Sequence, residues 1–156
     1  MARAPLSLKA RAIGLLAQRE HSRAELRRKL LRIERLRLAA ADEVDEATPA
    51  ATVDALLDTL AADGHLSETR FVESRLHLRA GRFGAQRIQQ ELARHGLKLD
   101  AEQQEQLRAT ELERAREVWL RRFGPEPAAE PAERARQTRF LLARGFAPEL
   151  VRRLLR

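Results

Sequence analysis

The residues of this sequence best suited to chemistry are its arginines, which dominate its basic side chains. All but three of the 30 Lys and Arg residues are Arg, the exceptions being Lys9, Lys29 and Lys98. The planar guanidinium binds phosphate or carboxylate through two parallel hydrogen bonds and keeps its charge at physiological pH. The sequence therefore predicts an acidic partner, either a nucleic acid or a protein surface. The alternative is that the arginines reflect a coding bias and good helix propensity.

Seven arginines in two groups are the candidate partner-binding residues: Arg23, Arg27 and Arg28, then Arg75, Arg79, Arg82 and Arg87. The second group surrounds a corner at Gly81 and Gly84 and has no acidic residue between its first and last members. The corner lacks the Lys-Ser/Thr and the preceding strand of a phosphate-binding P-loop. We interpret it as a tight connector between two helices whose arginines face an acidic surface. Phe83 is expected to fill the core there, with base stacking as the alternative.

The sequence predicts no catalytic residue, no metal site and no cofactor. It contains no Cys and no Tyr, which excludes thiolate zinc sites, iron–sulfur ligation and a Cys nucleophile. No Ser/His/Asp arrangement emerges, and no pair of the four histidines has the i, i+4 spacing, with a carboxylate, of a helical metal site. Four acids lack the glycine and alternating ligands of a calcium loop and are interpreted as a solvated acidic loop. These acids are Asp42, Glu43, Asp45 and Glu46.

The chain of 156 residues has a net charge of +7, and this charge is unevenly distributed. Residues 1–38 hold eleven basic and three acidic side chains, whereas residues 39–63 hold seven acids and no base. Only five Phe and one Trp supply aromatic bulk, so a core of Leu, Ala, Val and Ile is expected, which suits packed helices. No apolar run is long enough to span a bilayer, and the N-terminus lacks the apolar stretch of a signal peptide. We expect a cytoplasmic protein.

Helix signals recur along the whole chain, and the predicted fold class is all-α. Helix starts are predicted at Ser22, Thr48-Pro49, Ser67 and Asp100, and helix ends at Gly64, Gly81, Gly96, Gly124 and Gly145. About nine helices are expected, including separate ones around Leu107 and over Leu112–Phe123, with Leu141 and Leu142 both facing inward near the end of the eighth. Trp119 is expected to be the largest core anchor of the last third of the chain.

The helices form three similar groups. Gly96-Leu97 and Gly145-Phe146 look equivalent, and aligning them places Leu92 on Leu141 and His95 on Arg144. This pattern predicts three tandem three-helix repeats, of helix-turn-helix type, that form an elongated, curved molecule. The expected repeats span residues 1–63, with an acidic insertion at about 33–49, then 64–110 and 111–156.

Three strings of residues resemble the RecX family, regulators of the recombinase RecA. His65-Leu-Ser-Glu-Thr-Arg-Phe71, with Arg79-Ala-Gly-Arg-Phe-Gly84 and Glu91-Leu-Ala-Arg-His-Gly-Leu97, is similar to the family's central repeat. Arg19-Glu-His-Ser-Arg-Ala-Glu-Leu26 resembles its first repeat, and Arg139-Phe-Leu-Leu-Ala-Arg-Gly-Phe146 resembles its third. The sequence departs from the family in its long acidic link over residues 33–49 and in Ser67, where Asp is common.

The resemblance implies a non-enzymatic, all-helical protein that binds along the groove of a RecA filament on single-stranded DNA. It implies inhibition of filament growth, strand exchange, ATP hydrolysis and repressor cleavage, in the setting of DNA repair, recombination and the SOS response. We expect a monomer that contacts DNA indirectly or weakly and has no small-molecule substrate and no membrane partner. The alternatives are a direct DNA-binding protein that reads bases through Arg23, Arg27 and Arg28, and a helical adaptor with no link to nucleic acid.

Overall fold

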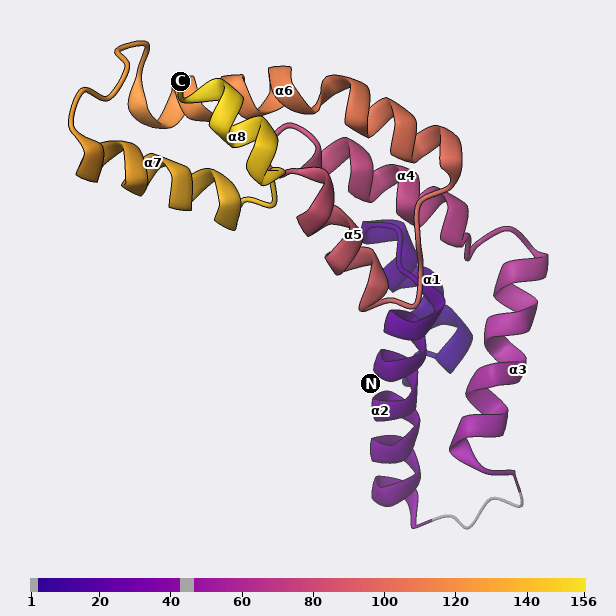
Figure 1. Cartoon of the computed structure of the whole chain (residues 1–156). Coiled ribbons are helices and arrows are strands. Elements are labelled where there is room, and N and C mark those ends of the chain that lie inside the picture. Colours follow the sequence, from indigo (N-terminus) through magenta and orange to yellow (C-terminus); the bar gives the residue numbers. More distant parts are fainter. Residues whose placement is uncertain (1–2, 43–46) are drawn as a thin grey trace. The chain divides into compact units, whose positions relative to one another are not determined.

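The computed structural model describes residues 3–42 and 47–156, and in this part of the chain it contains eight helices and no strand (Figure 1). The helices are α1 (Leu8–Gln18), α2 (Arg23–Ala41), α3 (Pro49–Ala62), α4 (Glu68–Arg79), α5 (Ala85–Ala93), α6 (Ala101–Phe123), α7 (Pro131–Ala143) and α8 (Pro148–Leu154). The all-α prediction is confirmed. The chain divides into two compact units, Met1–Phe71 and Val72–Arg156, which we call unit 1 and unit 2.

The predicted helix caps are present in the structure. The Ser22 hydroxyl accepts a hydrogen bond from the Glu25 amide at 3.1 Å, and Thr48 caps α3 in the same way. Asp100 and Gln103 form a complete capping box, in which each side chain accepts from the other residue's backbone amide, at 2.7 and 3.0 Å. These side chains satisfy backbone donors that a helix start leaves unpaired, so the starts are locally encoded.

Unit 1 is built around the contact between α2 and α3, which lie side by side in Figure 1, with α1 packed against the same core. One face of each helix, together with Leu66 in the connection after α3, supplies aliphatic side chains that are fully or almost fully buried. These are Ala12, Leu26, Leu30, Leu31, Val53, Leu57, Leu60 and Leu66. The spacing of three and four residues within each helix explains why one stripe of each is apolar.

The helix α2 is longer than expected and enters the predicted acidic insertion. It continues to Ala41 and ends at Asp42, whose φ of +51° is left-handed. Glu34, which was expected near the start of the insertion, is a buried helical residue paired with Arg37 at 2.8 Å. The prediction that the helix gives way near residue 33 is therefore wrong, because no Gly or Pro interrupts the segment. The other acids of the predicted loop, Glu43, Asp45 and Glu46, lie outside the described residues.

The third helix of the second repeat and the first of the third repeat are one continuous helix, α6. The sequence predicts two helices here, around Leu107 and over Leu112–Phe123, and that prediction is wrong. The segment contains no Gly or Pro, so nothing interrupts helix propagation until Gly124. Both halves bury apolar residues, Leu107 in the first and Ala115 in the second. The second and third repeats therefore share one helix.

The end of unit 2 has its own core, where α6, α7 and α8 meet. Trp119 is buried there, as predicted, and its indole N–H donates to the Gln137 side-chain oxygen at 2.8 Å. Leu141 is fully buried, but Leu142 is 38% exposed, so the expectation that both leucines face inward is wrong for Leu142. Adjacent helical residues point about 100° apart, and here the core lies on the side of Leu141.

Two glycine corners of unit 2 contact each other directly. The Gly84 amide, at the start of α5, donates to the Arg144 carbonyl oxygen at 2.8 Å, and the Gln86 amide donates to the Gly145 carbonyl oxygen at 3.3 Å. A Cβ on Gly84 would lie 2.3 Å from the Gly145 backbone, and one on Gly145 would lie 2.4 Å from the Arg87 Cβ. Glycine is required at both positions because the two backbones touch. The corner after α4 and the corner after α7 are thereby fixed to each other.

Candidate functional site

The candidate arginines of unit 1 lie on α2, and two of the three face acids on α3. Arg23 Nη2 lies 2.6 Å from Asp58 Oδ1, and Arg27 Nε lies 2.7 Å from Asp54 Oδ1. The hydrogen bond between Arg27 and Asp54 lowers the pKa of the Asp54 carboxyl and raises the pKa of the guanidinium. Arg28 is exposed. Packing of α3 against α2 therefore places a negative neighbour beside two of the three positive charges.

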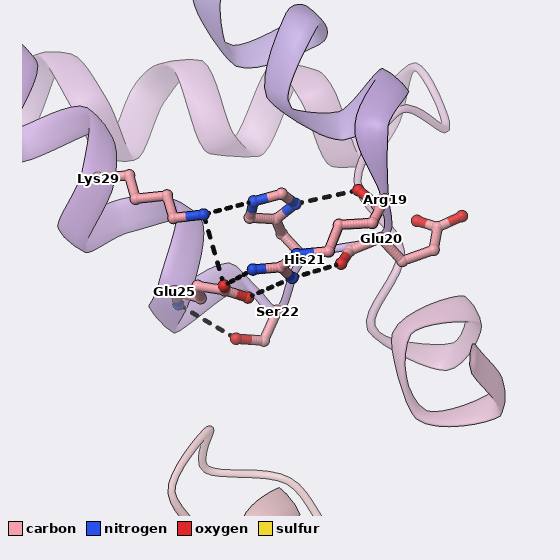
Figure 2. A network of polar contacts seen from close by, with 6 residues as sticks. All are labelled: Arg19, Glu20, His21, Ser22, Glu25 and Lys29. Atoms are coloured by element: carbon pink, nitrogen blue, oxygen red, sulfur yellow. Dashed lines mark hydrogen bonds and ion pairs between the residues drawn. The ribbon is translucent and has the colours of Figure 1, made fainter. Parts of the chain in front are cut away.

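A polar network joins the end of α1 to the start of α2 (Figure 2), and the sequence indicates only two of its members, Ser22 and Glu25, as a predicted capping pair. The Glu25 carboxylate accepts hydrogen bonds from Nη1 and Nη2 of Arg19 and forms an ion pair with Lys29. His21 is buried; its Nδ1 lies 3.0 Å from the Arg19 carbonyl oxygen and its Nε2 lies 2.9 Å from Lys29 Nζ. Each ring nitrogen therefore has a partner in this network.

The network is built for ionised Glu25 and neutral His21. Burial alone would raise the pKa of Glu25, but the hydrogen bonds and charge of Arg19, with the charge of Lys29 and that of His21 when it is protonated in acid, lower it to about 2. Burial lowers the pKa of His21, against the hydrogen bond to the Arg19 carbonyl. A neutral ring that donates through Nδ1 and accepts from the lysine through Nε2 fits both contacts. We interpret this network as a brace between two helices.

The central corner brings the four candidate arginines of unit 2 to its α4–α5 region, but an acid from α5 joins them. Glu91 lies 3.2 Å from Arg79 and 3.8 Å from Arg87. Phe83 is buried as predicted, with the guanidinium of Arg87 4.3 Å from its ring centre. Arg82 is exposed and forms no ion pair with any described residue. The distribution of acids along the sequence did not reveal Glu91, because helix α5 folds back beside α4.

Three arginines that the sequence interpretation missed lie beside Arg82. Arg121 and Arg122 lie in the last turn of α6, and Arg144 is the C-cap residue of α7. They line one pocket of unit 2 together with Arg82, Val118 and Phe140. We call the four cationic residues of this pocket the arginine cluster. One signal was available in the sequence: Arg144 matches His95 in the repeat alignment and precedes Gly145, a predicted helix end, so Arg144 was expected at a helix terminus.

The arginine cluster is held in place by neighbouring backbone and aromatic groups. Arg121 Nη2 donates to the Gly81 carbonyl oxygen at 2.6 Å. The Arg144 guanidinium carbon lies 5.1 Å from the ring centre of Phe83 and 5.0 Å from that of Phe140. Such distances allow cation–π attraction. Two of the four guanidinium groups, those of Arg121 and Arg144, therefore have contacts within unit 2 that orient them.

Helix α6 also fixes the α4–α5 corner from the other side. Arg114 donates to the carbonyl oxygens of Ala80 and Phe83 at 2.8 and 2.7 Å, and Glu111 accepts from the Ala85 amide at 3.1 Å. Burial lowers the pKa of Arg114, opposed by the charge of Glu111. The carbonyls and amide at this corner are thus paired by side chains of a helix from the following repeat. This arrangement explains how a glycine-rich connector can hold Arg82 in place.

The described residues contain no group of three or more His, Cys, Asp or Glu side chains placed to hold a metal ion. The histidines are dispersed, with His21 in the network described above and His65 and His77 exposed. None of the helices that the structure describes is both long and apolar enough to cross a membrane.

Comparison with known proteins places the chain among bacterial regulatory proteins. The family model for the third three-helix domain of RecX matches residues 109–155. A Regulatory protein RecX from Ralstonia nicotianae is 52% identical over 98% of this chain and 89% of its own length. Proteins of the same name from Leptothrix cholodnii and Pseudomonas putida are 50% and 41% identical, covering 99% and 97% of this chain and 90% of their own lengths. Because this likeness runs through all three repeats, the chain belongs to the RecX family of regulatory proteins.

Proposed function

We propose that this protein binds the RecA filament formed on single-stranded DNA and restrains it, so that filament growth, strand exchange, ATP hydrolysis and repressor cleavage are inhibited. The observation that carries the proposal is the identity with RecX regulatory proteins along nearly the whole chain. The protein acts by binding, as a cytoplasmic monomer without a cofactor, and serves DNA repair, recombination and the SOS response. Tandem helical repeats suit this role, because several weak contacts on one polymer combine into strong binding.

The seven candidate arginines would provide part of the contact with the filament. Arg82 supports this role best, since it is exposed and has no acidic partner among the described residues. Arg79 is part of the same corner but shares Glu91 with Arg87. A partner carboxylate or phosphate would compete with Glu91 for these side chains. Surface ion pairs of this kind contribute little to stability, so such an exchange is feasible.

The test is a double charge reversal, Arg79→Glu with Arg82→Glu, measured in RecA-driven strand exchange. We expect inhibition to weaken by more than tenfold, because like charges at an interface cost several kcal/mol. The matched control is Arg108→Glu with Arg116→Glu, which reverses two exposed, ion-paired arginines of α6 and changes the net charge equally. Single Arg82→Glu avoids any repulsion with Glu91 inside the fold. If folded parent and variants inhibit strand exchange equally, the corner is not the contact.

The alternative function, base reading in duplex DNA by a recognition helix, finds less support. Two of the three arginines it needs, Arg23 and Arg27, contact acids of α3. A salt series with bare duplex and with RecA filament distinguishes the two functions, since phosphate-dominated binding weakens steeply with salt. Tighter binding to the duplex than to the filament would favour the alternative.

A further inference from the structure

The arginine cluster concentrates positive charge in one pocket of unit 2. Its members, Arg82, Arg121, Arg122 and Arg144, form no ion pair with any residue in the described ranges, 3–42 and 47–156. Elsewhere in the chain, arginines such as Arg23 and Arg87 do form ion pairs, with nitrogen–oxygen distances of 2.6 and 3.8 Å to a carboxylate. Burial lowers the pKa of Arg144, and the charges of Arg82, Arg87, Arg121 and Arg122 lower it further. The cluster is thus a place where cations repel each other and an anion would relieve the repulsion.

The fold explains how these cations can gather. Arg121 and Arg122 lie in the last turn of α6, and Arg144 caps the end of α7. Helix C-termini carry a partial negative charge that favours nearby cations. Arg122 lies 5.5 and 5.8 Å from the ring centres of Phe123 and Phe140, which stack at 5.2 Å in an edge-to-face arrangement. Aromatic rings therefore lie against these guanidinium groups, and much of the hydrogen-bonding capacity of the arginines remains available.

We propose that the arginine cluster binds phosphate groups of a single-stranded DNA backbone. The pocket has a volume of about 270 Å³, which gives room for a phosphate group. Guanidinium groups match phosphate through paired N–H donors. Arg121 and Arg144 each commit a donor to a backbone carbonyl, of Gly81 and of Arg82 respectively.

A nucleic-acid backbone fits the cluster better than an acidic protein segment. Phosphates are carried on the backbone itself, one charge per nucleotide, whereas each Glu carboxylate ends a flexible side chain that loses rotamer freedom when it is ordered. Four guanidinium groups gathered at one pocket match an anion whose charge recurs along its own backbone. The partner class rests on the proposed function, in which the protein meets single-stranded DNA within a RecA filament. The inference goes further by assigning direct contact with DNA to residues of the second and third repeats.

The experiment measures binding of fluorescent oligo(dT) to the full chain without RecA, over a salt series. The variant is Arg82→Gln with Arg122→Gln, which removes two exposed charges and none of the backbone hydrogen bonds described above. The matched control is Arg108→Gln with Arg116→Gln, which removes equal charge from two ion-paired arginines of the same unit. We expect more than a tenfold loss of affinity for the pocket variant and less than threefold for the control. The salt slope should fall by about 0.7 for each phosphate that the variant no longer binds.

Competition identifies the ligand. Inorganic phosphate should displace oligo(dT) from the parent protein more effectively than chloride does at the same ionic strength. Poly-glutamate of equal total charge should compete less well than unlabelled oligo(dT); stronger competition by poly-glutamate would overturn the assignment in favour of an acidic protein segment. Equal losses of affinity in the pocket and control variants would also overturn it, because binding would then follow net charge alone.

Failure of this inference can be distinguished from failure of the proposed function. Inhibition of RecA strand exchange by the parent protein is measured in its own reaction, so failure to inhibit RecA contradicts the proposed function only. Loss of oligo(dT) binding in the pocket variant supports the DNA contact in either case. Circular dichroism melting of both variants confirms that each is folded before affinities are compared.

Discussion

The arginines of the two units differ in what surrounds them. On α2 of unit 1, Arg23 and Arg27 lie against Asp58 and Asp54 of α3. In unit 2, the arginine cluster has no acidic partner among the described residues and is bordered by helix ends and aromatic rings. Residues 1–38 carry the largest excess of basic side chains, yet their packing partner comes from the acidic stretch that follows. Net charge along the sequence is therefore a poor guide to where a positive surface without ion pairs forms.

The difference also shows which charges are structural. In unit 1, Glu25 with Arg19 and Lys29 joins α1 to α2, so the basic residues there hold the fold together. In unit 2, the corresponding role belongs to backbone contacts between two glycine corners and to Arg114. The arginine cluster is therefore available to a ligand.

The largest effect is expected from Gly145→Val, which would break the support of the arginine cluster. A Cβ at this position meets the Arg87 side chain at 2.4 Å, and the backbone φ of +89° disfavours any side chain. Overpacking and left-handed strain together should destabilise unit 2 by roughly 3–5 kcal/mol. Denaturant unfolding followed by Trp119 fluorescence reports on this unit. Gly81→Ala is the control in the same unit: a Cβ there meets nothing within 4 Å, so stability should stay equal or rise.

A smaller effect, confined to unit 1, is expected from acid. The pKa of Glu25 is about 2 in the folded protein, below its ordinary value of 4.5. A carboxyl whose pKa is lower in the folded than in the unfolded protein stabilises the fold at any pH above the unfolded pKa. This contribution is therefore present above about pH 4.5 and is lost as pH falls towards 2. The difference corresponds to at most about 3 kcal/mol, and we expect roughly 1–2 because Arg19 is half exposed.

The measurement for Glu25 is the free energy of unfolding of parent and Glu25→Gln between pH 2 and 6. The variant should start less stable and lose less on acidification across this range. Burial lowers the pKa of His21, so its effect on the free energy of unfolding begins at higher pH, as pH falls below its ordinary pKa of 6.5. An acid dependence equal in parent and variant would mean that the network does not hold an ionised carboxylate.

The smallest effect should come from making unit 1 resemble unit 2. Asp54→Asn with Asp58→Asn removes the carboxylates beside Arg27 and Arg23. We expect oligo(dT) affinity to rise by about two- to fivefold at low salt, because the two guanidinium groups would no longer be partly neutralised by carboxylates. The free energy of unfolding should change little, since exposed ion pairs contribute little to stability. No gain in affinity at any salt concentration would show that the position of the arginines, and not their pairing, separates the two units.

Local signals in the sequence determined much of the fold. The caps at Ser22, Thr48 and Asp100, and the helix ends at Gly96 and Gly145, are where the sequence predicts them, because hydrogen bonds of nearby side chains and glycine's access to positive φ act within a few residues. The repeat alignment correctly predicted that Leu92 and Leu141 are buried. Two predicted helix breaks are wrong, one near residue 33 and one between Leu107 and Leu112, because neither segment has a Gly or Pro and the helix continues.

The sequence by itself determined the all-α class, the helix starts, the buried stripes and a resemblance that led to the family. Only the tertiary structure decided which charges are paired. Asp54 reaches Arg27, and Glu91 reaches Arg79. The Arg144 guanidinium also donates to the carbonyl oxygen of Arg82, 62 residues away along the chain. Capping and periodicity are local and can be detected along the chain, whereas electrostatic pairing depends on distance in space. The arginine cluster therefore becomes visible only when α6 and α7 end beside the corner that follows α4.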